Sequence, residues 1–185
     1  MTNLFDRIDG DFRSLDIEKA ANAFIAHKIP VLLTHGIDDQ GNCTCCKKDC
    51  PSIGKHPIGE FFPKGHKSAC LDKKLVARCL RKYPQANLAI CPPPEFVVID
   101  IDGDEGLKTY ESLKLPKTAT VKTGRGYHCY FQCNASAISI SKLDGIDIKT
   151  SNGYVVVPPS NHHSGVRYKW LKQNQLPKLQ NCPRP

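Results

Sequence analysis

The sequence of 185 residues lacks any apolar run approaching the roughly 20 residues that a membrane-spanning helix needs. Its first stretch, MTNLFDRIDGDFRS, contains acidic side chains and no apolar segment, which argues against a secretory signal peptide. A G-x-S-x-G motif is also absent, so no obvious serine nucleophile is present. We therefore expect a cytoplasmic protein that does not contact a membrane.

Negative charge is comparatively scarce. The chain has 18 Asp and Glu residues against 26 Lys and Arg residues, which gives a formal net charge of +8. A basic surface favours an anionic partner, and nucleic acid or nucleotide phosphates are the leading candidates, although many basic domains bind nothing acidic. Hydrophobic residues make up 40% of the chain, which is an ordinary proportion for one globular domain with its own core.

Cysteine, in contrast, is abundant, with ten residues in the chain. In a reducing compartment, cysteines that cluster in the sequence indicate a metal site before disulfides. The segment CTCCKKDCPSIGKHP, residues 43–57, offers a tetrahedral set for a structural Zn²⁺: Cys43, Cys45, Cys50 and His56. Cys46 is an alternative to either neighbouring cysteine, and His66 or Cys70 could replace His56. Free thiols or a redox pair are the competing interpretations.

Hydrophobic periodicity predicts three helices, at residues 15–27, 71–83 and 104–113. Strands are predicted at residues 29–35, 86–91, 96–102, 118–123, 127–133, 145–150, 153–159 and 166–170. The turn at residues 124–126 predicts one hairpin, and residues 151–152 predict a second. This order indicates an α+β sheet with helices on one side, interrupted by an insertion at about residues 40–67. Residues 171–185 are polar and contain proline, as is typical of a linker.

The stretch FVVIDIDG, residues 96–103, places two carboxylates in an otherwise apolar strand. Side chains two residues apart share a face about 6.6 Å from each other, so Asp100 and Asp102 should point the same way. Val97, Ile99 and Ile101 should then face the core. Two carboxylates on one face suit Mg²⁺ or Mn²⁺, which prefer oxygen ligands. The alternative is that each aspartate pairs with a lysine on an exposed sheet face.

A third carboxylate lies in GIDIKT, where Asp147 alternates with Ile146 and Ile148. Lys149 shares the face of Asp147. Beside the strand of Asp100, this pair would supply a further metal ligand and a cation for phosphate. The alternative is a solvated hairpin face.

Two loops carry histidines. His128 follows the turn Gly124-Arg125-Gly126, in which backbone N–H groups and a guanidinium can approach an anion closely. Alternation places His128 and Tyr130 on one face of their strand. The loop PPSNHHSG, residues 158–165, should lie at the end of the strand that pairs with the Asp147 strand, and turn chemistry does not explain its two histidines. A structural role is the alternative for each histidine.

Together these motifs resemble the bifunctional primase–polymerase (Prim-Pol) domain of the archaeo-eukaryotic primase superfamily. The resemblance covers roughly residues 17–170. It rests on five segments in the right order: CTCCKKDCPSIGKHP, SACLDKKLVARCLRKYPQANLAI, VVIDIDG, TGRGYHCYF and GIDIKTSNGYVVVPPSNHHSG.

The resemblance implies an RRM-like antiparallel or mixed sheet with flanking helices. It also assigns roles by position. The divalent-metal ligands would be Asp100, Asp102 and Asp147, and His128 would hold the incoming triphosphate. Further nucleotide contacts would come from Arg125, Lys149, Ser160 and His162. The match favours Cys43, Cys45, Cys50 and His56 as zinc ligands, with Cys46 where glycine is usual.

The expected function is therefore a DNA-dependent primase and DNA polymerase. It would synthesise and extend primers with two divalent metals, using nucleoside triphosphates on a single-stranded DNA template, in replication of a plasmid, phage or mobile element. Residues 1–170 would form the catalytic domain, and residues 171–185 a linker, because relatives often continue into a helicase domain. The competing hypotheses are a metal-dependent nuclease and a non-catalytic, zinc-bearing nucleic-acid-binding module.

Overall fold

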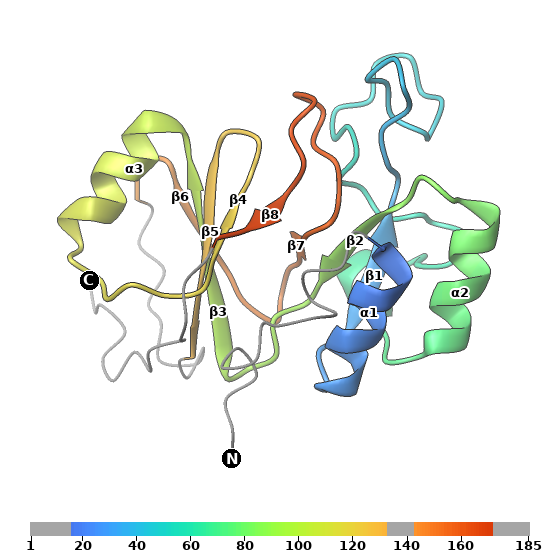
Figure 1. Ribbon diagram of the computed structural model, residues 1–185, viewed down its shortest axis with the longest axis horizontal. Coiled ribbons are helices and arrows are strands. Elements are labelled where there is room, and N and C mark those ends of the chain that lie inside the picture. Colours follow the sequence, from blue (N-terminus) through green and yellow to red (C-terminus); the bar gives the residue numbers. More distant parts are fainter. Residues whose placement is uncertain (1–15, 133–142, 172–185) are drawn as a thin grey trace.

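Two antiparallel sheets organise residues 16–132 and 143–171, which are the residues that the computed structural model describes (Figure 1). The helices are α1 (Ile17–Ala26), η2 (Gly65–Ser68, a 3₁₀ helix), α2 (Lys73–Lys82) and α3 (Gly103–Ser112). The strands are β1 (Val31–Thr34), β2 (Asn87–Ile90), β3 (Phe96–Asp102), β4 (Thr120–Lys122), β5 (Gly126–Gln132), β6 (Ile146–Lys149), β7 (Val155–Val156) and β8 (Lys169–Trp170). The predicted α+β class and the three helices are confirmed.

The smaller sheet has the strand order β1-β2-β7 and carries α1 and α2. The apolar stripe of α1 is buried against it, with Phe24 fully covered. Asp72 caps α2 as its sequence predicts, because its carboxylate accepts hydrogen bonds from the backbone N–H groups of Lys74 and Leu75. These helices close one side of the main core.

The larger sheet has the order β6-β3-β5-β4-β8. Val97, Ile99 and Ile101 of β3 are buried as predicted, in a second hydrophobic cluster that α3 covers. Val98 faces the opposite way and belongs to the main core, together with Tyr130 of β5. Because both faces of β3 are apolar over most of its length, each face needs its own covering layer.

This double burial corrects the expectation of helices on one side of a single sheet. Figure 1 shows α3 at one end of the molecule and α1 and α2 at the other, with the two sheets between them. The main core joins α1, α2 and the smaller sheet to the inner face of the larger sheet.

The predicted hairpin of residues 145–150 and 153–159 is wrong. β6 pairs with β3 in the larger sheet, whereas β7 pairs with β2 in the smaller one. Val155 and Val156 are both buried, so this short strand serves as a core element between the sheets and is not the second arm of a solvated hairpin. The loop at residues 158–165 consequently follows a strand of the smaller sheet, and the chain crosses between the sheets at residues 150–154.

Residues 1–15 and 172–185, at the two ends of the chain, lie outside the described residues. Apart from Leu171, the predicted linker at residues 171–185 lies outside the described residues. Within the described residues, no helix combines the length and the apolar character that crossing a membrane would require.

Candidate active site and metal cluster

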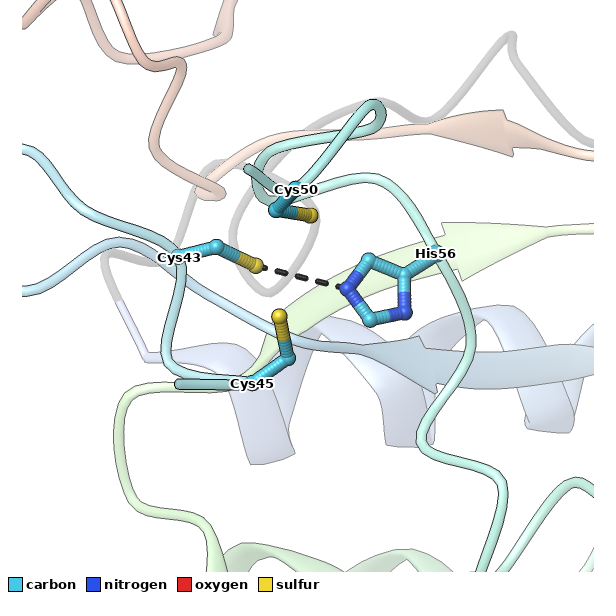
Figure 2. Close-up of side chains that lie close together, drawn as sticks. All are labelled: Cys43, Cys45, Cys50 and His56. Atoms are coloured by element: carbon cyan, nitrogen blue, oxygen red, sulfur yellow. Dashed lines mark hydrogen bonds between the residues drawn. The ribbon is translucent and has the colours of Figure 1, made fainter. Parts of the chain in front are cut away.

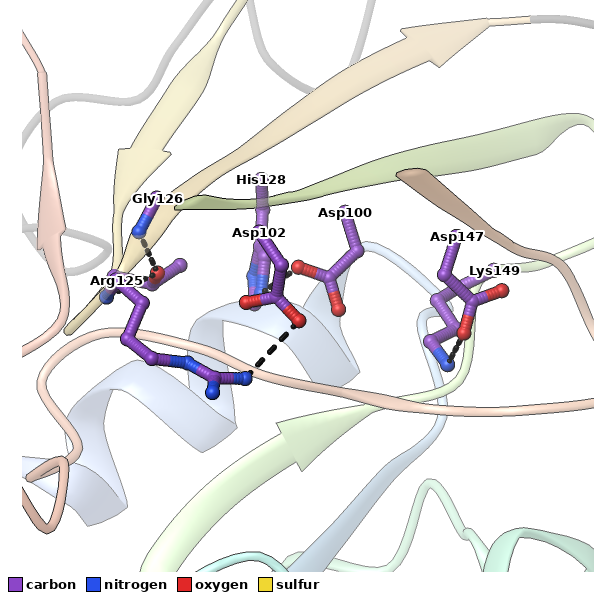
Figure 3. A network of polar contacts seen from close by, with 8 residues as sticks. Asp100, Asp102, Arg125, Gly126, His128, Asp147 and Lys149 are labelled. Carbon is purple, nitrogen blue, oxygen red and sulfur yellow. Dashed lines mark hydrogen bonds and ion pairs between the residues drawn. The ribbon is translucent and has the colours of Figure 1, made fainter. Parts of the chain in front are cut away.

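Asp147, Asp100 and His128 form a row across β6, β3 and β5. The strand register places Asp100 directly opposite both of the others. Directly opposed side chains in antiparallel strands have Cβ atoms about 5 Å apart, so register alone brings these three groups together. Asp100 Oδ1 lies 3.3 Å from His128 Nε2 (Figure 3). Asp102 lies two residues further along β3, at its end and on the same face as Asp100.

Each outer carboxylate has a cationic neighbour. Arg125 Nη2 lies 3.2 Å from Asp102 Oδ2, and the Lys149 ammonium pairs with Asp147 (Figure 3). Asp102 and Asp147 are exposed, so water screens these pairs and they are weak in the absence of a ligand. The sheet thus presents carboxylates and cations side by side on one open face.

The row lies in a cleft of about 490 Å³, which is within the usual range for a small-molecule site. The lining residues are Lys55, His66, Asp100, Asp102, His128, Asp147, Lys149, Asn152, Gly153, Tyr154, Val155, Val156 and Tyr168. Because Val155 and Val156 belong to the smaller sheet, the cleft opens between the two sheets. A ligand entering it would meet the acidic face of the larger sheet.

Asp100 is charged at neutral pH. Burial by itself raises the pKa of its carboxyl group, but the hydrogen bond and charge of His128 and the charges of Lys149 and Lys55 outweigh burial and hold the pKa below its usual value. The His128 side chain is buried, and its ring centroid lies 5.9 Å from that of Tyr168. The imidazole is therefore held in one orientation beside an ionised carboxylate.

The turn before His128 depends on its two glycines. A Cβ at Gly126 would lie 1.8 Å from the carbonyl oxygen of Ile101, and a Cβ at Gly124 would lie 2.0 Å from Nδ1 of His162. Thr123 Oγ1 accepts hydrogen bonds from the N–H groups of Gly126 and Arg125, at 2.9 and 3.3 Å. The glycines thus allow β5 to pack directly on β3 and His162 to lie against the turn.

Three of the predicted nucleotide contacts do not line the cleft. Arg125 is exposed beside its rim, and both Ser160 and His162 are buried. Ser160 Oγ accepts a hydrogen bond from the Leu88 N–H at 2.8 Å and donates one to the Leu88 carbonyl at 3.2 Å, which fastens its loop to β2. For these three residues, nucleotide binding stays a prediction. The other five predicted site residues on the strands are brought together.

Sequence reasoning did not place two prominent lining residues, Lys55 and Tyr168, in the cleft, although Lys55 is one of several lysines of the cysteine-rich segment that could contact a nucleic-acid backbone. Lys55 belongs to the insertion, where no periodicity shows which way a side chain points. Tyr168 precedes the edge strand β8, and alternation in so short a strand does not reveal the cleft. The only available signals were the position of Lys55 next to a proposed zinc ligand and the aromatic character of Tyr168.

The cysteine-rich segment forms a Cys/His cluster of Cys43, Cys45, Cys50 and His56, whose ligand atoms all lie within 4.8 Å of one another (Figure 2). The Sγ of Cys43 is 3.4 Å from the Nε2 of His56. In a tetrahedral site with metal–ligand distances of about 2.0 to 2.3 Å, the four ligand atoms must lie about as close to one another as the atoms of this cluster do. The cluster is therefore a possible zinc site.

The alternative ligands lie outside this cluster. Cys46 has a backbone φ of 60°, and its exposed thiol is directed to the carbonyl of Thr44 at 3.7 Å. His66 lines the cleft, and the backbone of Cys70 pairs with that of Val31. Of the open alternatives, the geometry supports the set that the resemblance favoured.

The protonation states of the Cys/His cluster would make metal binding depend on pH. Burial lowers the pKa of His56, and the charge of Lys47 lowers it further, so this imidazole is a neutral ligand at pH 7. Burial raises the pKa of the Cys43 thiol to about 11. Zinc would have to displace a proton from that thiol, so binding should release protons and weaken in acid.

Comparison with known families gives one match over most of the chain. The Prim-Pol family model, described as bifunctional DNA primase/polymerase, N-terminal, matches residues 21–185. No curated protein matches the sequence.

Proposed function

The chain belongs to the Prim-Pol family of bifunctional DNA primase/polymerase N-terminal domains, and on that basis we propose that it is a DNA-dependent primase and DNA polymerase. It would synthesise primers on single-stranded DNA and extend them from nucleoside triphosphates. The observation that carries the proposal is the gathering of Asp100, Asp102, Asp147 and His128 in one cleft large enough for a nucleotide.

The oxygen-rich donor set fits Mg²⁺ or Mn²⁺. Asp100, Asp102 and Asp147 would hold two ions, which when bound activate the primer 3′-hydroxyl and neutralise the leaving pyrophosphate. A carboxylate whose pKa lies below its usual value, as that of Asp100 does, is available to a cation across the physiological pH range.

The remaining site residues would orient the triphosphate. His128, fixed beside Asp100, would donate a hydrogen bond to a phosphate oxygen, and Lys149 would move from Asp147 to the phosphates when a cation binds that carboxylate. Arg125 can exchange Asp102 for a phosphate in the same way. Ser160 and His162 would be further nucleotide contacts, on a loop that Ser160 fastens to β2.

The Cys/His cluster would hold a structural Zn²⁺. Four protein ligands leave no open position for a reacting water, so a catalytic role for this ion is disfavoured.

We place the catalytic domain at residues 1–170, with the zinc-binding insertion at about 40–67 and a linker from residue 171. The five-stranded sheet with α3 supports an RRM-like assignment of the core. The proposed setting is replication of a plasmid, phage or mobile element, with a helicase domain or protein as partner.

The test is primer synthesis and extension by the purified chain on single-stranded DNA, with Mg²⁺ or Mn²⁺ and with deoxy- and ribonucleoside triphosphates supplied separately. Asp100→Asn should reduce product formation by at least about 100-fold, the effect expected when a group that stabilises the transition state is lost. Asp104→Asn is the matched control, because Asp104 is an exposed carboxylate of α3 outside the cleft.

Wild-type protein that forms no product with either metal would contradict the proposal. Degradation of DNA without added nucleotides, lost in Asp100→Asn, would instead indicate a nuclease. DNA binding that is unchanged in Asp100→Asn, with no turnover in either assay, would indicate a binding module.

A further inference from the structure

Lys55 connects the Cys/His cluster to the active-site cleft. It directly precedes His56, one of the four possible zinc ligands, yet its half-buried side chain lines the cleft of Asp100. The cysteine-rich segment therefore contributes a residue to the candidate active site and is more than a separate structural unit.

The backbone around Lys55 is bound to two strands of the smaller sheet, β1 and β2. The carbonyl of Gly54 accepts hydrogen bonds from Thr34 Oγ1 at 3.0 Å and Asn87 Nδ2 at 2.9 Å, and both of these side chains are buried. The Tyr154 hydroxyl donates to the Lys55 carbonyl at 2.9 Å. Hydrogen bonds thus hold the backbone on both sides of the Lys55 Cα. The side chain therefore starts from a fixed point in the wall of the cleft.

The same backbone is bound to the Cys/His cluster. The N–H of Gly54 donates to Cys43 Sγ at 3.5 Å, and His56 follows Lys55 directly. Gly54 has a φ of +69°, and a Cβ there would lie 2.5 Å from Ile37 Cδ1, so this tight path suits glycine. Both neighbours of Lys55 therefore depend on the geometry of the cluster.

The charge of Lys55 is not committed to an acidic partner. Lys149 is paired with Asp147 and Arg125 with Asp102, but no carboxylate of residues 16–132 and 143–171 lies within the 4.0 Å salt-bridge distance of Lys55. Its field nevertheless reaches the cleft, since it contributes to lowering the pKa of Asp100. An ammonium group in this position is ready to bind an incoming anion.

We propose that Lys55 binds the triphosphate of the incoming nucleotide, and that the zinc-loaded Cys/His cluster positions it to do so. This inference rests on the proposed polymerase function and extends it. A lysine ammonium donates charge-assisted hydrogen bonds to phosphate oxygens. These bonds contribute most to affinity when the lysine backbone is already fixed, because less conformational entropy is then lost on binding. Loss of zinc should therefore weaken nucleotide binding even when all three aspartates are intact.

The first experiment measures equilibrium binding of a non-hydrolysable deoxynucleoside triphosphate to the full chain with Mn²⁺, and of a single-stranded oligonucleotide separately. Lys55→Ala should weaken triphosphate binding roughly 10- to 100-fold, the range for a lost hydrogen bond to a charged group. Lys55→Arg should restore part of it. Lys48→Ala removes the same charge from an exposed position of the same segment and should have no effect.

Unchanged triphosphate affinity in Lys55→Ala would overturn the proposal, and so would a loss confined to the oligonucleotide, which would assign Lys55 to the DNA backbone. Circular dichroism and thermal melting of each variant would show that the fold is retained.

The second experiment tests the coupling. Cys45→Ser should lose bound zinc, measured by elemental analysis, and should lose triphosphate affinity to the same extent as Lys55→Ala. In the Lys55→Ala background, Cys45→Ser should cause no further loss of affinity, because the two changes act through one contact. Independent, additive losses would show that the cluster does not position Lys55. If Cys45→Ser does not fold, removal of zinc from the folded wild type and from Lys55→Ala gives the same comparison.

The two proposals fail in different ways. Wild-type protein that binds triphosphate through Lys55 but forms no product would overturn the polymerase function alone. If the wild type is active and Lys55→Ala binds triphosphate as tightly as the wild type does, only the role of Lys55 would be overturned. Protein that binds no triphosphate at all would overturn both.

Discussion

At the scale of single residues, His162 shows how burial sets protonation. Its side chain is buried, and its ring centroid lies 4.2 Å from that of His163 and 5.8 Å from that of Tyr168. Burial lowers the pKa of His162 to about 4, and the charges of Lys55 and His163 contribute. The imidazole is therefore neutral at pH 7, which suits a residue packed against the turn at Gly124.

This protonation predicts a pH-dependent stability. An unfolded histidine has a pKa near 6.5 and takes up a proton in mild acid, whereas folded His162 stays neutral until about pH 4. The unfolded chain therefore binds more protons in this window, and the free energy of unfolding should fall by about 3 kcal/mol between pH 7 and pH 4 through this residue alone. Urea denaturation at several pH values measures it.

The quantity to compare between variants is the change in the free energy of unfolding with pH, and not its value at one pH. His162→Asn should flatten the dependence by that amount, even if the substitution also costs stability at pH 7. His163→Asn, at the exposed neighbour, should leave most of it, because burial, the largest cause of the low pKa of His162, is kept in this variant. Parallel curves for the wild type and His162→Asn would show that His162 is not responsible.

At the scale of elements, the contact of β3 with β5 determines the site. The register places Asp100 opposite His128 and Asp102 opposite Gly126. Gly126 lies so close to the carbonyl of Ile101 that no side chain fits, and the obstructing atom belongs to the backbone, which cannot rotate away. The packing of β3 against β5 is therefore sensitive to a single added carbon at the end of the strand pair where the functional groups lie.

Gly126→Ala should destabilise the protein by about 3 kcal/mol or more, because the added methyl group forces β5 away from β3. Urea denaturation measures the free energy of unfolding. Gly59→Ala is the matched control, since a Cβ at Gly59 meets nothing within 4 Å, and its effect should stay within about 0.5 kcal/mol. Equal stability of the two variants would contradict this account of the β3–β5 contact.

At the scale of the whole molecule, the Cys/His cluster lies in the longest segment of the described residues that has no regular structure. Between β1 and η2 the chain contributes few buried apolar side chains, among them Ile58 and Phe62, and the cluster gathers residues 43–56 above the smaller sheet. A metal with four protein ligands can organise such a segment, since its binding free energy adds to folding.

We therefore predict one zinc ion per chain, measured by elemental analysis. Cys50→Ser should lose this ion and lower the melting temperature by at least about 10 °C, because a structural zinc contributes several kcal/mol to the folded state. Cys46→Ser should keep both the ion and the melting temperature, because its thiol lies outside the cluster. Loss of zinc in Cys46→Ser would instead show that Cys46 is a zinc ligand.

The sequence by itself determined the features that depend on local spacing. Alternation in β3 separated Val97, Ile99 and Ile101 from the two aspartates, and the same rule paired His128 with Tyr130 on one face of β5. The helix cap at Asp72 was readable for the same reason, since a cap depends only on the next few residues. The family was identified from the order of short motifs, and the Prim-Pol match confirms it.

Only the tertiary structure decided how distant segments meet. The separation of β6 and β7 into two sheets, the covering of β3 on both faces and the choice against Cys46 depend on packing that no local pattern contains. The position of Lys55 is the clearest case, because its backbone is held by hydrogen bonds that Thr34 and Asn87 donate to the carbonyl of Gly54 and that Tyr154 donates to the carbonyl of Lys55. Spacing along the chain places side chains within one strand or helix, but a cleft forms where separate elements pack together.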